Sequence, residues 1–324
     1  MNLLTGAMAA AVLAPNALGQ DANFYRWCGQ QVADGHVCVS LYPPLTGFAA
    51  LPLVALSPAV TAALMSSLGA VLLALGIRHE TRGLPMADRV LIAVATFSFA
   101  PVVYELLLGQ ITLLSAASVY VIVRRPDRAR NGLAFGVVLA LAPKPMLALV
   151  LVWMLVWRRR ALAAALAVGA ALTAAGLVLA GPQAYLDWAT TLLGGGGVAS
   201  AAITALALHG NLSLWPMTVP KAVLGALVVV AALYATLRDP DRGLVASVLA
   251  GLLIAPYTGL YAVSLVVLVV QPAARVAPVA TRLLALVVNL CLVFVSALVL
   301  WGCLVIAAVM PRRRPRSRVV PSAP

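Results

Sequence analysis

Residues 20–47 read QDANFYRWCGQQVADGHVCVSLYPPLTG and form the first polar stretch of a chain that is apolar almost everywhere else. The stretch contains two carboxylates, an arginine, a histidine, two cysteines and four aromatic rings. It leads through Tyr42-Pro43-Pro44 into a long hydrophobic region. We interpret it as a functional loop at one face of a membrane, held in place by the apolar helices around it.

The composition is that of a membrane protein. Of the 324 residues, 63% are hydrophobic and only 10% are charged, and the mean hydropathy is +1.04, whereas soluble domains contain about 25% charged residues. Long apolar runs separated by short polar joints indicate helices that cross a bilayer. We therefore expect an all-α polytopic membrane protein, with a single transmembrane domain at residues 1–310 and a basic, disordered tail at 311–324.

The basic residues predict how this domain is oriented. The net charge is +13, and Lys and Arg concentrate in short joints at 78–82, 124–130, 158–160 and 238–242 and in the tail. This is the positive-inside pattern, so these joints are expected on the cytoplasmic side. We expect contact with membrane lipid and not with nucleic acid. Eleven crossings would leave the tail outside, so the same rule favours about twelve transmembrane helices.

Two polar loops are expected on the outer side, at 19–47 and 181–216. Residues 3–18 are short for a span and are either a signal peptide or, as we prefer, a clipped first helix that delivers Asp21 to the outer surface. A surface or re-entrant helix follows at 45–56. Other helices are expected at 58–77, 86–103, 106–123, 133–142, 147–157, 161–180, 222–237, 245–255, 261–270 and 283–310. The turn between the two short helices 133–142 and 147–157 is expected to lie recessed within the membrane.

Two of the four cysteines, Cys28 and Cys38, flank a short polar segment of the first loop. If this loop faces the outside, a disulfide between them is feasible, because that compartment is oxidising. Two unpaired thiols are the alternative. Cys291 and Cys303 lie in an apolar stretch and are expected to be inert.

The chain has only nine acidic residues, so each can be assigned to a side. Five fall beside arginines on the expected inner side: Glu80, Asp88, Asp127, Asp239 and Asp241. The other four are expected outside with a lysine and a histidine: Asp21, Asp34, Glu105, Asp187, Lys144 and His209. Ionisable groups at membrane depth are costly and tend to be functional.

This outer set suits sugar transfer. A carboxylate can act as general base on a sugar hydroxyl, a cation can hold a phosphate, and aromatic faces can stack on a sugar ring. The sequence contains no Walker loop, zinc-ligand cluster or Ser-His-Asp arrangement, so we expect no cofactor and no metal.

Each residue also has a structural interpretation. Asp21 could cap a helix, Lys144 could extend from a helix end towards water, and Glu105 could be a buried ion-pair partner. Tyr42-Pro43-Pro44 could be a rigid turn, and His209 could be structural or solvated.

The order of several short motifs is more specific than any one of them. Asp21 to Tyr25 is followed by Tyr42-Pro43-Pro44, by a Gly109-Gln110 turn and by Lys144-Pro145. A Gly181-Pro182 loop with Tyr185 and Trp188 comes next, followed by Asn211-Leu212-Ser213. From residue 20 to about 270 the chain resembles glycosyltransferase family 87, multi-spanning enzymes of the GT-C class that use polyprenyl-phosphate sugars such as polyprenyl-phosphate-mannose.

The resemblance implies a GT-C-like helical bundle in the cell membrane with outer-face catalytic loops. It implies transfer of a sugar, with mannose expected, from a polyprenyl-phosphate donor to a lipid or cell-envelope glycan acceptor. Asp21 would be the catalytic base, in a reaction that inverts the anomeric carbon. The substrate-binding candidates are Tyr25, Arg26, Tyr42, Glu105, Gln110, Lys144, His209 and Asn211.

Lys144 is the candidate for the donor phosphate and His209 a weaker one, and both rest more on charge and expected side than on the motif. The family's Asn-Gln-Ser segment has Leu212 at its centre here. A transporter or flippase of a lipid-linked or small solute is the alternative function, and it would have ionisable groups near mid-membrane and repeated halves. A structural subunit of an envelope complex is a third interpretation.

Overall fold

The computed structural model describes residues 19–38, 42–82, 85–97, 100–192, 214, 218–255 and 265. Within these ranges the chain is helical and contains no strand, which confirms the all-α class. The helices are α2 (Gln20–Ala33), α3 (Leu45–Ala49), α4 (Leu51–Val54), α5 (Pro58–Glu80), α6 (Met86–Phe97), α7 (Ala100–Leu108), α8 (Thr112–Arg124), α9 (Leu133–Leu141), α10 (Ala148–Trp157), α11 (Arg159–Ala180), α12 (Pro182–Leu192), α14 (Val219–Arg238) and α15 (Pro240–Ile254). Two 3-10 turns, η1 (Ala129–Gly132) and η2 (Pro145–Leu147), precede α9 and α10.

Three of the described helices, α5, α11 and α14, are long and apolar enough to cross a membrane. The 23 residues of α5 span about 34 Å, slightly more than the hydrocarbon core of a bilayer. Most residues of the three helices remain exposed, as expected for side chains that face lipid. The protein is therefore an all-α membrane protein. The predicted helix at 3–18, the last predicted helices and the basic tail lie outside the described residues, so about twelve crossings stays a prediction.

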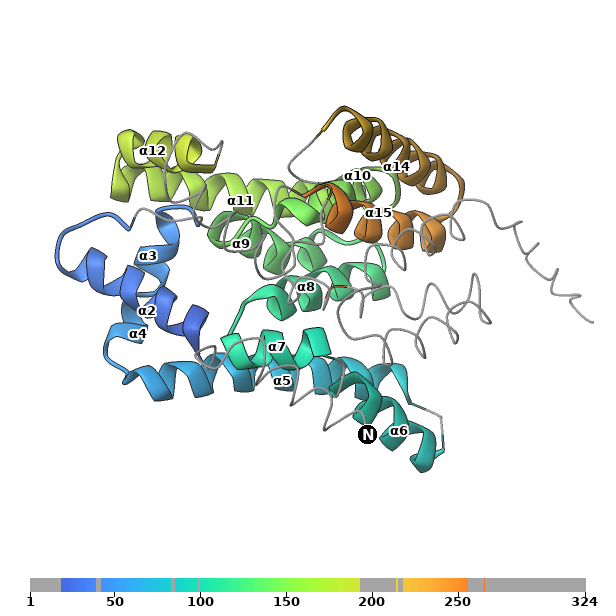
Figure 1. The fold of residues 1–324 in the computed structure, drawn as a ribbon, viewed down its shortest axis with the longest axis horizontal. Coiled ribbons are helices and arrows are strands. Elements are labelled where there is room, and N and C mark those ends of the chain that lie inside the picture. The colour runs from blue at the N-terminus through green and yellow to red at the C-terminus, as the bar shows by residue number, and fades with distance from the viewer. Residues whose placement is uncertain are drawn as a thin grey trace, which may run out of the picture.

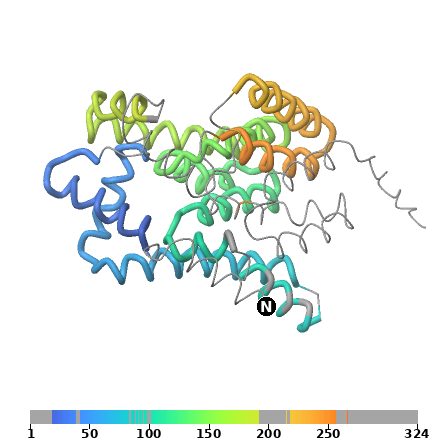
Figure 2. Tube along the Cα trace, in the orientation of Figure 1, coloured from blue at the N-terminus to red at the C-terminus, as the bar shows by residue number. Residues whose placement is uncertain are grey.

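The shorter helices lie between the long ones. Figures 1 and 2 show α5 and α11 along opposite sides of the bundle, with α8, α9 and α10 between them and α14 and α15 towards one end. The main core joins α8, α10, α11, α14 and α15. Every residue of α15 from Arg242 to Leu253 is buried, and Trp153 of α10 donates to the carbonyl of Pro240 at the start of α15, at 2.8 Å.

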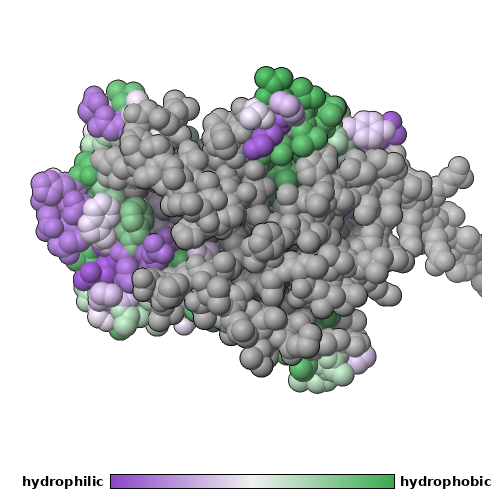
Figure 3. Space-filling model, in the orientation of Figure 1, coloured by the Kyte–Doolittle hydropathy of each residue, from purple (hydrophilic) through white to green (hydrophobic). Residues whose placement is uncertain are grey.

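At the other end of the bundle, α2, α3 and α4 form a cap (Figure 1). The segment expected as a loop is thus largely helical, because Ala22, Tyr25, Cys28 and Gly29 recur on one face and are buried against the neighbouring helices. The expected helix at 45–56 is two short helices, α3 and α4. Hydrophilic residues gather over this end of the surface, whereas hydrophobic residues cover α14 (Figure 3).

The opposite ends of the helices carry the arginines, and we call this region the arginine end. It contains Glu80, Arg124, Asp127, Arg158 and Asp239. Arg124 pairs with Glu80 at 2.7 Å, and Arg158 donates to the carbonyls of Ile122 and Val123. Asp127 accepts from two backbone N–H groups at the start of α11, and Asp239 does the same at the start of α15. These acids therefore have the structural roles expected of loop charges.

The α9–α10 pair forms almost where it was predicted. With nine and ten residues, the arms are each about 15 Å long. Helix α9 starts and α10 ends near the arginine end. Because both are much shorter than α5, the turn between them does not reach as far along the bundle as α5 does. This turn carries Lys144, which is only 6% exposed, so the turn is buried within the protein, and its depth in the membrane stays a prediction.

The α7–α8 turn differs from the expectation. Helix α7 continues to Leu108, and α8 starts at Thr112, so the turn consists of residues 109–111. Glu105 was expected in this turn but lies in the last helical turn of α7 and is fully buried. The sequence between the two predicted helices has no proline to end α7 earlier, and the positive φ of Gly109 ends it instead.

Candidate functional site

Five polar side chains meet beneath the cap: Asp21, Tyr25, Tyr42, Gln110 and Lys144. We call them the polar cluster. The Gln110 amide is central, and its Nε2 donates to Asp21 Oδ2 at 2.5 Å. Its Oε1 accepts from the hydroxyls of Tyr25 at 3.0 Å and Tyr42 at 3.4 Å, and from Lys144 Nζ at 3.3 Å. The Gln110 amide therefore connects the Lys144 ammonium group to the Asp21 carboxylate.

A glycine brings Gln110 to Asp21. Gly109 has a φ of 66°, and a Cβ on it would lie 2.8 Å from the Cβ of Ala22. The α7–α8 turn therefore packs directly against the first turn of α2, one residue from Asp21. The backbone N–H of Gly19 donates to the carbonyl of Leu107 at 2.7 Å, which ties the start of α2 to the end of α7.

A second close approach holds Lys144. Gly251 of α15 lies so near η2 that a Cβ on it would be 1.8 Å from the carbonyl oxygen of Met146. This contact brings the Lys144 turn against the buried helix α15. Lys144 Nζ donates to the Tyr42 hydroxyl at 3.3 Å and lies 5.3 Å from the centre of the Tyr42 ring, a cation–π distance.

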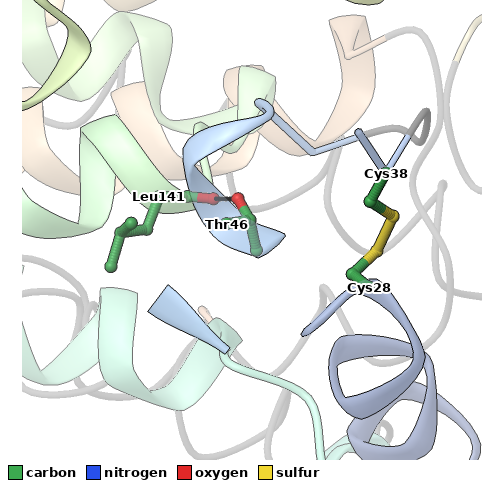
Figure 4. Close-up of a disulfide and its surroundings, with 4 residues drawn as sticks. All are labelled: Cys28, Cys38, Thr46 and Leu141. Carbon is green, nitrogen blue, oxygen red and sulfur yellow. Dashed lines mark hydrogen bonds between the residues drawn. A yellow bond between two sulfur atoms is a disulfide. The ribbon is translucent and has the colours of Figure 1, made fainter. Parts of the chain in front are cut away.

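The segment before α3 is anchored on both sides of Tyr42. Cys28 and Cys38 form a disulfide, which ties the middle of α2 to the chain leading to Tyr42 (Figure 4). After Tyr42, the Thr46 hydroxyl donates to the carbonyl of Leu141 at the end of α9 (Figure 4). Of the two alternatives left open by the sequence, the structure has the disulfide.

The electrostatic environment of the cluster suits proton transfer. Burial raises the pKa of Asp21, and this effect exceeds the opposing effects of the Gln110 hydrogen bond and the Lys144 charge. Burial also raises the pKa of Tyr25 and Tyr42, so both remain neutral hydroxyl donors. The site therefore contains a carboxylate with strengthened basicity beside a buried ammonium group.

Other candidates are not brought to the cluster. Arg26 points to the α4–α5 link, where its guanidinium donates to the carbonyls of Leu56 at 2.8 Å and Val54 at 3.4 Å. Asp34 and Asp187 are exposed and accept from the glutamines one helical turn before them. His209 and Asn211 lie outside the described residues, and their roles stay predictions.

Two aromatic rings near the cluster were not among the predicted site residues. Phe24 lies 6.2 Å from Tyr42 and 5.6 Å from Trp27 between ring centres. Asp21, Phe24 and Trp27 follow one another at intervals of three residues, which aligns them along one ridge of α2. The sequence therefore contained a spacing from which both rings could have been predicted to lie near Asp21. Trp27 is 46% exposed, which is unusual for so large a ring on a mostly polar surface.

A shallow apolar depression, with room for about one water molecule, adjoins the site. It opens between α5 and α8, with Gln110 on its wall, and its remaining lining residues are Met65, Leu68, Gly69, Leu72, Ile111 and Leu114. Within the described residues, no group of three His, Cys, Asp or Glu side chains could hold a metal ion.

These features define an all-α membrane protein with a polar site recessed below one end of its helices. A family model described as glycosyltransferase family 87 matches residues 41–264, more than half of the chain. The chain therefore belongs to glycosyltransferase family 87 and is a glycosyltransferase, so the transporter and structural-subunit alternatives are set aside. No curated protein and no solved structure matches it. The matched range includes Tyr42, Gln110 and Lys144, whereas Asp21 and Tyr25 precede it.

Proposed function

We propose that this glycosyltransferase moves a sugar, mannose, from a polyprenyl-phosphate donor to a lipid or cell-envelope glycan acceptor. The observation that carries the proposal is the Gln110 amide, which bonds Asp21 on one side and Lys144 on the other. A base for the acceptor and a cation for the donor phosphate are thereby held one side chain apart.

Asp21 acts as the general base. Gln110 bonds Oδ2 of its carboxylate, and we assign Oδ1 to the acceptor hydroxyl. As the acceptor oxygen attacks the anomeric carbon, its proton passes to Asp21. The bond between that carbon and the phosphate oxygen breaks, the electron pair leaves with polyprenyl phosphate, and the configuration is inverted.

Lys144 binds the donor phosphate. Its ammonium group is buried, and charges interact more strongly where water is excluded. The phosphate oxygen gains negative charge as the sugar departs, so a cation held beside it favours the transition state. Tyr42 keeps the lysine in position through its hydroxyl and its ring.

The surroundings support a donor with a lipid tail and an acceptor with sugar rings. The apolar depression between α5 and α8 begins at Gln110, and the side chains that line it offer an apolar surface to an isoprenoid chain, which has to widen the depression on binding. On the other side, Phe24 and Trp27 extend from Asp21 along α2 and offer aromatic faces to the acceptor.

The expected location also has support. The arginine end fits the cytoplasmic side, and the cap, with its disulfide, lies at the opposite end of the bundle. Disulfides persist in oxidising compartments. We therefore propose a multi-pass protein of the cell membrane with its active site on the extracytoplasmic face.

The test is transfer of mannose from polyprenyl-phosphate-mannose in membranes that contain Asp21→Asn or Asp21→Ala. We expect a loss of at least about 100-fold in both variants, because general-base catalysis contributes about that much or more. Asp34→Asn, which changes the exposed acid directly after the same helix, is the matched control and should keep full activity. Full activity in both Asp21 variants would remove Asp21 as the base.

The pH profile tests the same assignment. Because burial raises the pKa of Asp21, its carboxyl is still protonated at pH values where an exposed aspartate is ionised. Activity should therefore fall, as the pH decreases, through a pKa above the ordinary value of about 3.9. The transfer rate is measured at each pH, and a return to neutral pH shows whether the protein has survived the exposure. The decrease in rate towards acid pH then gives the pKa.

A further inference from the structure

Glu105 holds the turn that presents Gln110. It lies in the last turn of α7, and its backbone carbonyl accepts from the Gln110 N–H at 3.2 Å. Its side-chain Oε1 accepts from the Leu113 N–H at 2.9 Å, in the first turn of α8. One residue therefore bonds both sides of the short turn that carries the central amide of the polar cluster.

The second oxygen of this carboxyl is in an unusual position. Glu105 has no exposed surface, and its Oε2 makes no hydrogen bond of ordinary geometry in the described part of the chain. The hydroxyl of Thr112, at the start of α8, is likewise buried without such a bond and interacts with this carboxyl. A buried carboxylate usually has both oxygens bonded or a cation beside it, because the charge is otherwise poorly solvated. A neutral carboxylic acid at this position can donate its proton to the Thr112 hydroxyl, so the geometry suits the protonated form.

The charged groups around the site also indicate that Glu105 is protonated. The titratable groups that interact with Glu105 are Asp21 and Tyr25 of α2, Tyr42 before α3, and Lys144 of the α9–α10 turn. The one ammonium group in this set faces two carboxyls. Asp21 is partly exposed and also bonded by Gln110, whereas Glu105 is fully enclosed. The proton of the coupled pair therefore resides on Glu105.

We propose that Glu105 is a positioning residue that acts in its protonated form, holding the Gln110 turn while leaving the Lys144 charge to the donor phosphate. This inference rests on the proposed function, because it takes Lys144 as the phosphate ligand. When Glu105 loses its proton at alkaline pH, its carboxylate competes for Lys144 and repels the phosphate. Donor affinity then falls while the fold persists.

The first experiment compares the wild type with Glu105→Gln, which keeps an acceptor for the Leu113 N–H and cannot ionise. We expect transfer within about twofold of the wild type at neutral pH. In the wild type the donor KM should rise about tenfold for each pH unit above the transition, as for a single linked proton. In Glu105→Gln this rise should be absent. Glu80→Gln, at the arginine end, is the control and should keep the wild-type rise.

Two results would overturn the inference. If Glu105→Gln raises the donor KM at neutral pH, Glu105 acts as a charged carboxylate. If Glu105→Gln keeps the alkaline rise of the wild type, Glu105 only holds the turn. Glu105→Leu, which removes the bond to Leu113 as well, should lower kcat about tenfold or more, and its folding is checked by thermal unfolding in detergent.

A binding measurement separates this inference from the proposed chemistry. The probe is polyprenyl phosphate, without its sugar, added to nanodiscs that contain Asp21→Asn, where no transfer can occur. Binding should weaken at alkaline pH in Asp21→Asn and stay constant in Asp21→Asn combined with Glu105→Gln. Equal weakening in both would count against Glu105 even if Asp21 proves to be the base, and pH-independent binding in the single variant would also contradict the inference.

Discussion

The polar cluster and the arginine end contain similar residues but use them differently. At the arginine end, Glu80 is paired with a guanidinium group, and Asp127 and Asp239 each accept two backbone N–H groups. These bonds give each carboxylate a charged or backbone partner, and they cap helices or connect them. Such contacts are typical of structural charges.

The hydrogen bonds of the polar cluster join side chains that lie between 17 and 102 residues apart in the sequence. Its members hydrogen-bond to one another, and Glu105 beside it is a fully buried carboxyl. An arrangement of this kind stabilises the fold less than apolar packing in the same space would. The comparison shows that hydrogen bonding between buried side chains from several helices, and not the number of charges, distinguishes the candidate active site.

The largest difference between the two regions is expected when one cation is removed from each. Lys144→Ala should lower kcat/KM for the donor about 100-fold, because it removes the phosphate ligand. Arg124→Ala should lower stability by about 1 kcal/mol through loss of a partly exposed ion pair and leave the donor KM unchanged. Transfer kinetics and thermal unfolding of both variants give the comparison. Equal losses of transfer would show that the two regions do not differ in function.

A smaller effect is expected from the turn that carries Gln110. Gly109→Ala should destabilise the protein by about 1–3 kcal/mol and lower transfer about tenfold, since the new Cβ combines a positive φ with a close contact to Ala22. Gly35→Ala is the matched control, because Gly35 has a φ of 81° and no atom within 4 Å of its added Cβ. If both variants behave alike in thermal unfolding and transfer, the close approach to α2 is not what positions Gln110.

The smallest effect concerns the ridge of α2. Trp27→Ala should raise the acceptor KM about fivefold, as for the loss of one aromatic contact of about 1 kcal/mol. Trp27→Phe keeps a ring and should restore most of the affinity, whereas Trp27→Leu keeps only apolar surface. Initial rates at varied acceptor concentration distinguish them. Wild-type behaviour of Trp27→Leu would indicate that Trp27 anchors the cap to the membrane surface instead.

The sequence by itself determined the membrane class, the approximate positions of most described helices and the family. Hydropathy and helix length are local properties, so α5, α11 and α14 and the short α9–α10 pair could be predicted to within a few residues. The positions of the arginines likewise predicted the end of the bundle at which Glu80, Asp127 and Asp239 have structural contacts.

Only the tertiary structure decided which outer polar residues meet. Arg26, Asp34 and Asp187 shared the expected side and chemistry with Asp21, yet Arg26 bonds backbone carbonyls and the two acids are exposed. The central position of Gln110 depends on the packing of α7 and α8 against α2 and on the approach of the Lys144 turn, all far apart in the chain. Periodicity identifies the buried face of a helix, but the partner of that face depends on how several helices pack together.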